Sequence, residues 1–278
     1  MESTQKPETT RREPLPSDLY DEQYFLTACE GYQEFSAEEG RQLSRRLRAA
    51  FALAEVGPGM CVLDVGCGRG EIVRHCALLG ADAYGVDYAA AAMGIARQAT
   101  ANLRREAGQH PVGQVGLLRA NARQLPFADG QFDRVLMFDV VEHLHPWELH
   151  EALQEAHRVL APDGRLVVHT APNAWYDRYA YPIVRFVRRL QGRGDHYPPN
   201  PRAFLVPENQ HVHVNEQSML SLQRALRQAG FTGRVWLDSP PQSRQENALE
   251  AALRRIAFDW PPFRWFFERE LFAVASKA

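Results

Sequence analysis

A short glycine-rich run between two apolar segments has the residue types and spacing of a cofactor loop. Gly66, Gly68 and Gly70 come shortly after Asp64. Glycines at such a turn let the backbone bend tightly and approach a ligand closely. A dinucleotide fingerprint reads Gly-x-Gly-x-x-Gly and cradles a pyrophosphate, whereas this loop reads Gly-x-Gly-x-Gly. The carboxylate of Asp64 therefore favours a ligand with a cationic amino acid moiety.

A second group of reactive side chains comes later in the chain. Asp139, Glu142 and His143 lie within five residues, and one helical turn would put both carboxylates on one face. Two carboxylates and an imidazole suit Mg²⁺, Mn²⁺ or Fe²⁺, and such an ion would lower the pKa of a substrate hydroxyl. The alternative is a site without metal, in which Glu142 and His143 act as acid–base groups or merely cap a helix and line a cleft.

Strands that alternate with helices must position these groups. The expected strands are short apolar runs at residues 60–65, 83–86, 115–118, 134–138, 165–169, 233–237 and 271–276. The expected helices cover residues 38–53, 71–79, 89–105, 146–160 and 218–229, and a turn is expected at 162–164. This alternation is typical of an α/β fold with a parallel sheet and helices on both faces. Ligands of such sheets bind beyond the carboxyl ends of the strands.

Changes in composition divide the chain into five parts. We expect a disordered, polar tail at 1–17, a helical cap at 18–55, the cofactor-binding core at 56–173, an insertion at 174–214, and the last helix and strands of the core at 215–278. The insertion is rich in Tyr, Pro and Arg, and it follows a strand on the active side of the sheet, so we interpret it as a lid over the substrate. The alternative is a helix with an apolar stripe in the core and a solvated basic face.

The motifs, taken in chain order, resemble those of the class I S-adenosylmethionine (SAM)-dependent methyltransferases. VLDVGCGRGE at residues 62–71 is similar to the cofactor loop of that family, and the segments at 127–144, 159–168 and 270–277 match its later motifs. The resemblance covers residues 56–170 closely and 215–278 more loosely. It implies a Rossmann-like, seven-stranded, mostly parallel sheet with the lid as an insertion, and SAM as the cofactor.

The resemblance also implies roles for single residues. Asp87, at the end of the second strand, resembles the acidic residue that holds both ribose hydroxyls. Asn121 stands where the family usually has the Asp that reads the adenine edge, and its amide oxygen is expected to accept from the adenine amine. The cofactor residues implied in this way are Asp64, Gly66, Cys67, Gly68, Gly70, Asp87, Tyr88, Asn121, Ala122 and Phe138.

The group at 139–143 is similar to a metal site in two branches of the family, the ubiquinone-pathway O-methyltransferases and the small-RNA terminal 2′-O-methyltransferases. The latter carry a further histidine after a Thr-Pro-Asn turn, and this chain has Ala-Pro-Asn at 171–173. The resemblance therefore implies His211 as the fourth ligand beside Asp139, Glu142 and His143, with His213 as the alternative. Asp139 departs from the glutamate that those branches carry.

Composition narrows the class of protein. Lys and Arg total 32 against 34 Asp and Glu, a net charge of −2, so the basic field of a nucleic-acid-binding protein is missing and nucleic acid is an unlikely partner. The four cysteines include no Cys-x-x-Cys pair, which is typical of a reducing compartment. The first residues have no apolar leader and no long apolar run follows. We therefore expect a cytoplasmic protein.

These observations predict O-methylation of a hydroxyl on a sugar, a lipid-linked glycan or another small hydroxylated metabolite, with His143 and Glu142 as catalytic residues. Two alternatives stay open: an N- or C-methyltransferase, and a SAM-binding module without catalysis. The intact loop together with Glu142 and His143 argues against the second. The apolar segment at 258–267 is expected to close the cleft, to form a homodimer or to touch a membrane surface.

Overall fold

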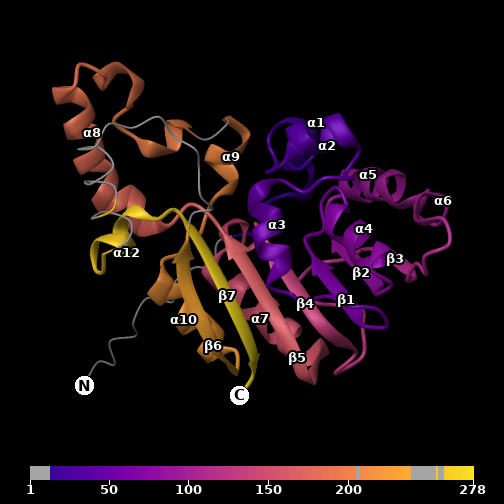
Figure 1. Cartoon of the computed structure of the whole chain (residues 1–278). Helices are drawn as coiled ribbons and strands as arrows, with labels where there is room; N and C mark the ends of the chain where they lie inside the picture. Colours follow the sequence, from indigo (N-terminus) through magenta and orange to yellow (C-terminus); the bar gives the residue numbers. More distant parts are fainter. Residues whose placement is uncertain (1–12, 205–206, 239–254, 256–259) are drawn as a thin grey trace, which may run out of the picture.

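The computed structural model describes residues 13–204, 207–238, 255 and 260–278. The described residues form one seven-stranded sheet of order β3-β2-β1-β4-β5-β7-β6, in which only β7 runs antiparallel to its neighbours (Figure 1). Its strands are β1 (Cys61–Val65), β2 (Asp82–Asp87), β3 (Val115–Arg119), β4 (Phe132–Phe138), β5 (Leu160–Thr170), β6 (Phe231–Asp238) and β7 (Glu270–Lys277). The expected Rossmann-like fold is confirmed.

Helices cover both faces of the sheet. The described helices are α1 (Glu22–Thr27), α2 (Tyr32–Glu38), α3 (Arg45–Ala52), α4 (Glu71–Leu78), α5 (Ala90–Thr100), α6 (Leu103–Ala107), α7 (Pro146–Val159), α8 (Tyr181–Leu190), α9 (Pro207–Val212), α10 (Met219–Gln228) and α12 (Phe263–Phe267). The buried side chains of α1, α3, α4 and α5 join one apolar core, and those of α7 and α10 join a second. The strands contribute side chains to both cores, as a sheet covered on both faces requires.

The order of the strands determines where a ligand can bind. The chain runs outward from β1 through β2 to β3, and then returns to place β4 on the other side of β1. The loops that follow β1 and β4 therefore leave the sheet in opposite directions and open a crevice between them. The glycine loop follows β1 and the Asp139–His143 segment follows β4, so both expected groups lie at this crevice.

Two expected helices are wrong in extent because the backbone turns inside them. The helix expected at 38–53 is interrupted, since Glu39 and Gly40 have φ values of 50° and 77°, which a right-handed helix excludes. α3 begins after Ser44, whose side chain accepts a hydrogen bond from the Leu47 amide. The helix expected at 89–105 is divided into α5 and α6.

The turn expected at residues 162–164 falls inside β5, at a point where the pairing with β4 is irregular. α7 ends at Val159, and β5 begins at the next residue. Leu160 pairs with Phe132 on β4, and the register shifts between there and Arg134. The next pair joins Arg134 to Arg165, so residues 161–164 have no partner on β4 and the Pro-Asp-Gly sequence, which has the chemistry of a turn, bulges out of the ladder.

The insertion at 174–214 projects away from the sheet at the carboxyl end of β5, with α8 at its outer end (Figure 1). The apolar stripe of α8 is exposed: Ile183 and Phe186 are 55% and 63% exposed, and Leu190 is 74% exposed. The interpretation of this stripe as part of the core is therefore wrong.

Arg69 joins the N-terminal helices to the glycine loop. Its guanidinium is buried and donates to the backbone carbonyls of Phe25, at 2.8 Å, and of Glu30. Its Nε donates to the buried carboxylate of Glu71 at 2.9 Å. The planar guanidinium carries five donors in a fixed geometry, and here it satisfies three partners from two separate parts of the chain.

We expect Arg69→Met to lower the free energy of unfolding by about 3–5 kcal/mol, because it leaves the Glu71 carboxylate buried and unpaired. Urea unfolding followed by circular dichroism measures this. The matched variant Arg69→Met with Glu71→Gln should recover part of the loss, since no unpaired charge remains. If the changes in unfolding free energy caused by the two substitutions were strictly additive, the Arg69–Glu71 ion pair would make no contribution of its own to stability.

Candidate active site

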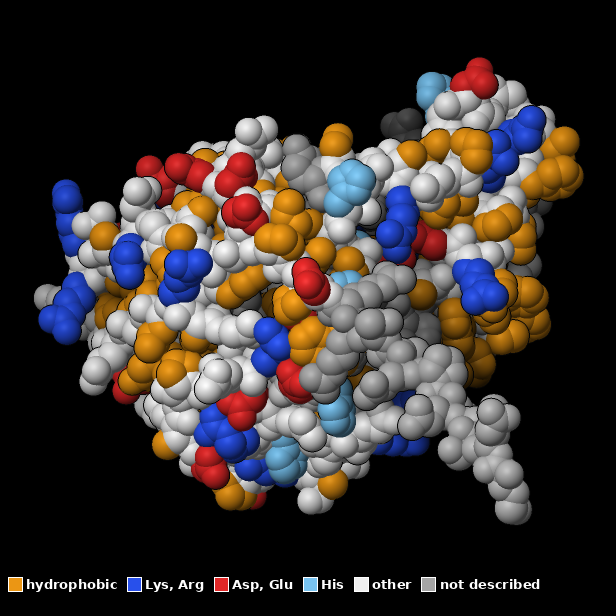
Figure 2. All heavy atoms as spheres, turned by 180° about the vertical axis from the view of Figure 1, so that it is seen from behind, with side chains coloured by type: hydrophobic (Ala, Val, Ile, Leu, Met, Phe, Trp, Pro, Cys, Tyr) orange, Lys and Arg blue, Asp and Glu red, His pale blue; other side chains and the backbone are white. Residues whose placement is uncertain are grey.

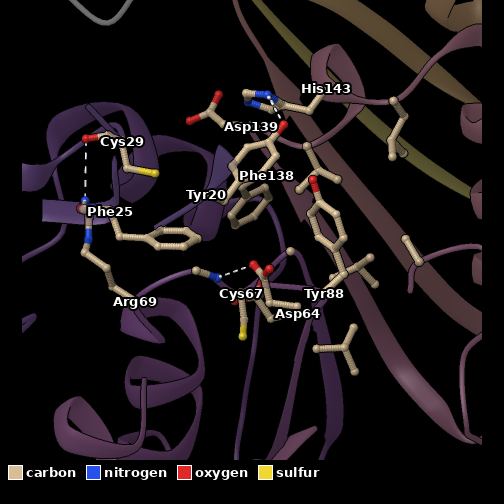
Figure 3. Close-up of a pocket in the computed structure, with 18 of the residues that line it drawn as sticks. Tyr20, Phe25, Cys29, Asp64, Cys67, Arg69, Tyr88, Phe138, Asp139 and His143 are labelled. Atoms are coloured by element: carbon tan, nitrogen blue, oxygen red, sulfur yellow. Dashed lines mark hydrogen bonds between the residues drawn. The ribbon is translucent and has the colours of Figure 1, made fainter. Parts of the chain in front are cut away.

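A cavity of about 300 Å³ lies at the carboxyl ends of β1, β2 and β4 (Figure 3). All but one of the expected cofactor residues line it, namely Asp64, Gly66, Cys67, Gly68, Asp87, Tyr88, Asn121, Ala122 and Phe138. The exception, Gly70, immediately precedes α4 with a φ of 80°, and a Cβ there would lie 2.8 Å from the Cβ of Ala96. Gly70 therefore serves the packing of α4 on α5.

The glycine loop is held between the strands on its two sides. The amides of Gly66 and Cys67 both donate to the carbonyl of Val86 at the end of β2, at 2.7 and 3.0 Å. Gly66 has a φ of 75°, and a Cβ there would lie 2.4 Å from Cγ2 of Val140, which follows β4. Only glycine fits this position, because both the backbone angle and the space exclude a side chain.

Two buried acidic side chains, Asp64 and Asp87, line the cavity. Burial raises the pKa of Asp64 to about 8, with further increases from the charges of Asp87 and Glu71. Asp87 accepts hydrogen bonds from the amides of Gly68 and Ala89 at 3.1 and 2.9 Å, yet burial still raises its pKa. A bound cation would reverse the shift at Asp64, so this end of the cavity suits a ligand with an ammonium group and hydroxyl donors.

The expected role of the Asn121 oxygen does not agree with its hydrogen bonds. Its Oδ1 already accepts from the amide and the Nε of Arg123, at 3.0 and 3.3 Å. An amide oxygen has two lone pairs, so in this arrangement it has no capacity left for an adenine amine. Asn121 lines the cavity, but its oxygen orders the turn after β3 instead.

The N-terminal segment covers the cavity, which the sequence did not predict. Tyr20, Tyr24, Phe25 and Cys29 line it together with Pro14, Leu15 and Ser17. The ring of Tyr20 packs against that of Tyr88 at 5.4 Å. The spacing of the aromatic residues at 20, 24 and 25 is the sequence feature that could have revealed an apolar helical face.

This result changes the expected division of the chain. Pro14, Leu15 and Ser17, which belong to the expected tail, contribute to the cavity wall, and residues 1–12 lie outside the described part. No described residue of 174–214 lines the cavity. The insertion approaches the site only at its end, where Val212 and His213 contact His143.

His143 lies across the cavity from Asp64 (Figure 3). Its Nδ1 is 3.2 Å from the carbonyl of Val212 and 3.2 Å from the hydroxyl of Tyr20. A carbonyl only accepts, so the proton of the neutral ring is on Nδ1 and the lone pair is on Nε2. Burial and the neighbouring His213 lower the pKa of His143 to about 3. The ring is therefore neutral at pH 7, in the form that accepts a proton or binds a metal.

A second histidine and a carboxylate lie beside His143. Glu142, His143 and His213 each offer a ligand atom, and these atoms lie within 4.8 Å of one another. Burial and the charge of Asp139 raise the pKa of Glu142 to about 8, and its Oε2 accepts from the hydroxyl of Thr170 at 2.8 Å. Nδ1 of His213 is buried without a hydrogen-bond partner among the described residues. Two imidazoles and one carboxylate are a donor set that divalent ions such as Fe²⁺ accept.

Asp139 and His211 lie outside this group, which corrects the expected ligand set. His211 is exposed on α9. The Oδ1 atom of Asp139 is 2.9 Å from Nδ1 of His169 on β5. Burial disfavours the charged form of both side chains, but the attraction between the carboxylate and the imidazolium is stronger. The pKa of Asp139 therefore falls to about 2 and that of His169 rises to about 9. Asp139 is thus neutralised by a histidine that the sequence did not single out.

Comparison with known proteins agrees with this geometry. Residues 63–168 match the family described as "Methyltransferase domain". The chain is 36% identical over 139 residues to the demethylmenaquinone methyltransferase of Thermus thermophilus, and the match covers 48% of this chain and 56% of the relative. It is 35% identical over 140 residues to the ubiquinone biosynthesis O-methyltransferase of Azorhizobium caulinodans, covering 50% and 51%. The chain thus spans about half the length of the curated relatives it matches.

Solved structures agree over more of the chain. A geranyl diphosphate methyltransferase in complex with SAM is 20% identical, with a TM-score of 0.55, and the match covers 91% of this chain and 92% of that one. A putative methyltransferase bound to the Haloferax volcanii Trm112 activator is 17% identical, with a TM-score of 0.58 and coverage of 95% and 99%. At such identities the likeness concerns the fold alone. Residues 63–168 thus match a methyltransferase domain, and the described part of the chain shares the fold of solved methyltransferases.

Proposed function

We propose that the chain transfers the methyl group of SAM to a hydroxyl of a small organic acceptor, with His143 accepting the proton. The observation that carries this proposal is the position of His143. Its neutral ring, held by Val212 and Tyr20, lines the same cavity as the carboxylates of Asp64 and Asp87. A cation-binding end and a proton acceptor in one cavity are what methyl transfer to a hydroxyl requires.

SAM supplies an electrophilic methyl group on a sulfonium, so the protein has to bind, orient and deprotonate. When SAM is bound, Asp64 would pair with its ammonium group and Asp87 would accept from its ribose hydroxyls. Tyr20 and Tyr88 pack over the cavity and exclude water. Nε2 of His143 takes the hydroxyl proton as the oxygen–methyl bond forms, and the electron pair of the broken carbon–sulfur bond stays on sulfur. The products are the methyl ether and S-adenosylhomocysteine.

For the acceptor we propose a sugar or another small hydroxylated metabolite. The name of the Azorhizobium relative, an O-methyltransferase, supports a hydroxyl as the acceptor, and aromatic side chains such as Tyr20 and Phe138 pack well against rings. Transfer to carbon is the second candidate, since the Thermus relative is named a demethylmenaquinone methyltransferase. Fragmentation of the product in mass spectrometry distinguishes the two, because only an O-methyl ether carries the new carbon on oxygen.

A divalent metal fits the group formed by Glu142, His143 and His213. The three donors converge, and the unpartnered Nδ1 of His213 is an atom that a ligand would satisfy. As an alternative to proton transfer to His143, we propose that these residues hold Mn²⁺ or Fe²⁺, whose charge would lower the pKa of the acceptor hydroxyl. Nε2 of His143 would then bind the ion instead of accepting the proton.

The affinity for SAM should rise with pH between about pH 6 and pH 7.5, by up to tenfold per unit. The Asp64 carboxyl, with a pKa of about 8, must lose its proton to pair with the ammonium, which stays charged below its own pKa of about 7.8. Isothermal titration calorimetry measures the affinity at each pH. The variant Asp64→Asn should bind weakly and lack this slope, and wild-type affinity in that variant would contradict the role of Asp64.

Removal of the His143 ring should spare SAM binding and lower turnover by roughly 10²–10⁴-fold, the scale of general base catalysis. The assay follows labelled methyl from SAM into an extract of the source cells, separated into aqueous and lipid fractions. The variants are His143→Ala and the control His150→Ala, which changes an exposed histidine on α7. Equal turnover of the two variants would exclude His143 from catalysis.

Substitution of His211 and His213, at the end of α9, tests whether the protein binds a metal. His213→Ala should lose bound Mn²⁺ or Fe²⁺, since it removes a donor of the three-residue group. His211→Ala, two residues away and exposed, should retain the metal and serves as the matched control. Elemental analysis of the purified proteins gives the metal content. A wild-type protein that binds neither ion from solution would disprove the site and leave His143 as a base without metal.

A further inference from the structure

The apolar side of α8 has no covering element among the described residues. Ile183, Phe186, Val187 and Leu190 follow the spacing i, i+3, i+4, i+7 and are between 42% and 74% exposed. A stripe with this spacing normally faces the core of a globular protein. Here no described residue covers it.

α12 and the residues before it extend the same apolar surface. Trp260, Phe263 and Trp265 are 67%, 46% and 40% exposed, while residues 258 and 259 of the expected apolar segment lie outside the described part. The ring of Phe266 on α12 lies 5.7 Å from that of Tyr179, which leads into α8. We call the combined surface the aromatic–arginine face; its apolar members are Tyr179, Ile183, Phe186, Val187, Leu190, Trp260, Phe263 and Trp265. Figure 2 shows hydrophobic and basic side chains next to one another over this end of the molecule.

The charges on this face are mostly positive. Its basic members are Arg178, Arg185, Arg188, Arg189 and Arg193. Between residues 176 and 197 the acids are Asp177 and Asp195 alone, and the five arginines form no salt bridge with a described residue. The whole chain carries a net charge of −2, so the positive charge is local to this face. Its chemical complement is an anionic surface.

We propose that the aromatic–arginine face docks on the surface of an anionic lipid bilayer. Helices that lie in the bilayer interface combine a basic polar side with Trp, Phe and Leu on the apolar side, and each arginine near anionic headgroups adds to the attraction. No described helix is long and apolar enough to cross a membrane, so the contact made by this face is peripheral. This inference does not depend on the proposed transfer to a hydroxyl.

A second copy of the chain fits this face less well than a bilayer. A two-fold contact puts the same surface against itself, so the arginines of one copy would meet those of the other with few acids nearby. The like charges would oppose that contact, whereas anionic headgroups would neutralise them.

Docking would also orient the active edge of the sheet. The insertion leaves the sheet at the carboxyl end of β5, the edge at which the cavity lies. A bilayer against α8 would therefore lie at the same end of the sheet as the cavity.

The test is sedimentation with vesicles of phosphatidylcholine alone or with added phosphatidylglycerol. The wild-type protein should bind the anionic vesicles, release at high salt and ignore the neutral ones. Phe186→Ser with Leu190→Ser removes apolar contact, and Arg189→Glu with Arg193→Glu reverses charge. Each pair should weaken binding by at least about tenfold. The serines remove two apolar side chains from the interface, and each arginine contributes about fivefold near an anionic surface.

Matched controls make the outcome specific. Leu220→Ser changes an exposed leucine on α10, and Arg104→Glu with Arg105→Glu reverses charge on α6, at the far end of the sheet (Figure 1). Both should bind as the wild type does, and thermal unfolding shows whether each variant is folded. Wild-type protein that stays in solution with anionic vesicles would overturn the proposal. The proposal would also be overturned if the wild-type protein bound no vesicles but formed a dimer in ultracentrifugation, and the α8 variants were monomeric.

Discussion

The close contact between Gly66 and Val140 joins the loop after β1 to the loop after β4, which leave the sheet in opposite directions. A Cβ at Gly66 would lie 2.4 Å from the Val140 side chain, so the backbone after β1 lies directly against the segment after β4. This contact places Asp64 and His143 in one cavity, although they are far apart in the sequence. The cavity therefore depends on having glycine at residue 66, which has no side chain, and on the strand order that puts β4 beside β1.

The acidic side chains at this edge of the sheet differ in their charged neighbours, and therefore in the ligands that they suit. Asp64 and Asp87 face the cavity, and burial raises the pKa of both. Asp139 also lines the cavity, but the buried His169 neutralises its charge. Glu142 is left with Thr170 and two neutral histidines. One part of the site thus suits a cationic ligand, and another suits a proton or a metal ion.

The N-terminal helices complete the site from outside the matched domain. Residues 63–168 carry the family match, but Tyr20 and Tyr24 close the cavity. Arg69 links the two parts, because it belongs to the glycine loop and donates to carbonyls of the N-terminal segment. A change in the loop should therefore also affect the cover above it.

The sequence by itself determined the strands, the sheet class and many of the residues that line the cavity, because strand periodicity and the glycine loop are local patterns. It also placed Glu142 and His143 together, since they are neighbours in the chain. Only the tertiary structure decided that His213 rather than His211 approaches them, that His169 pairs with Asp139, and that Tyr20 covers the cavity. These contacts join residues far apart in sequence, and no local pattern carries their distance. The outward orientation of the α8 stripe has the same cause, since periodicity identifies an apolar face but not what lies against it.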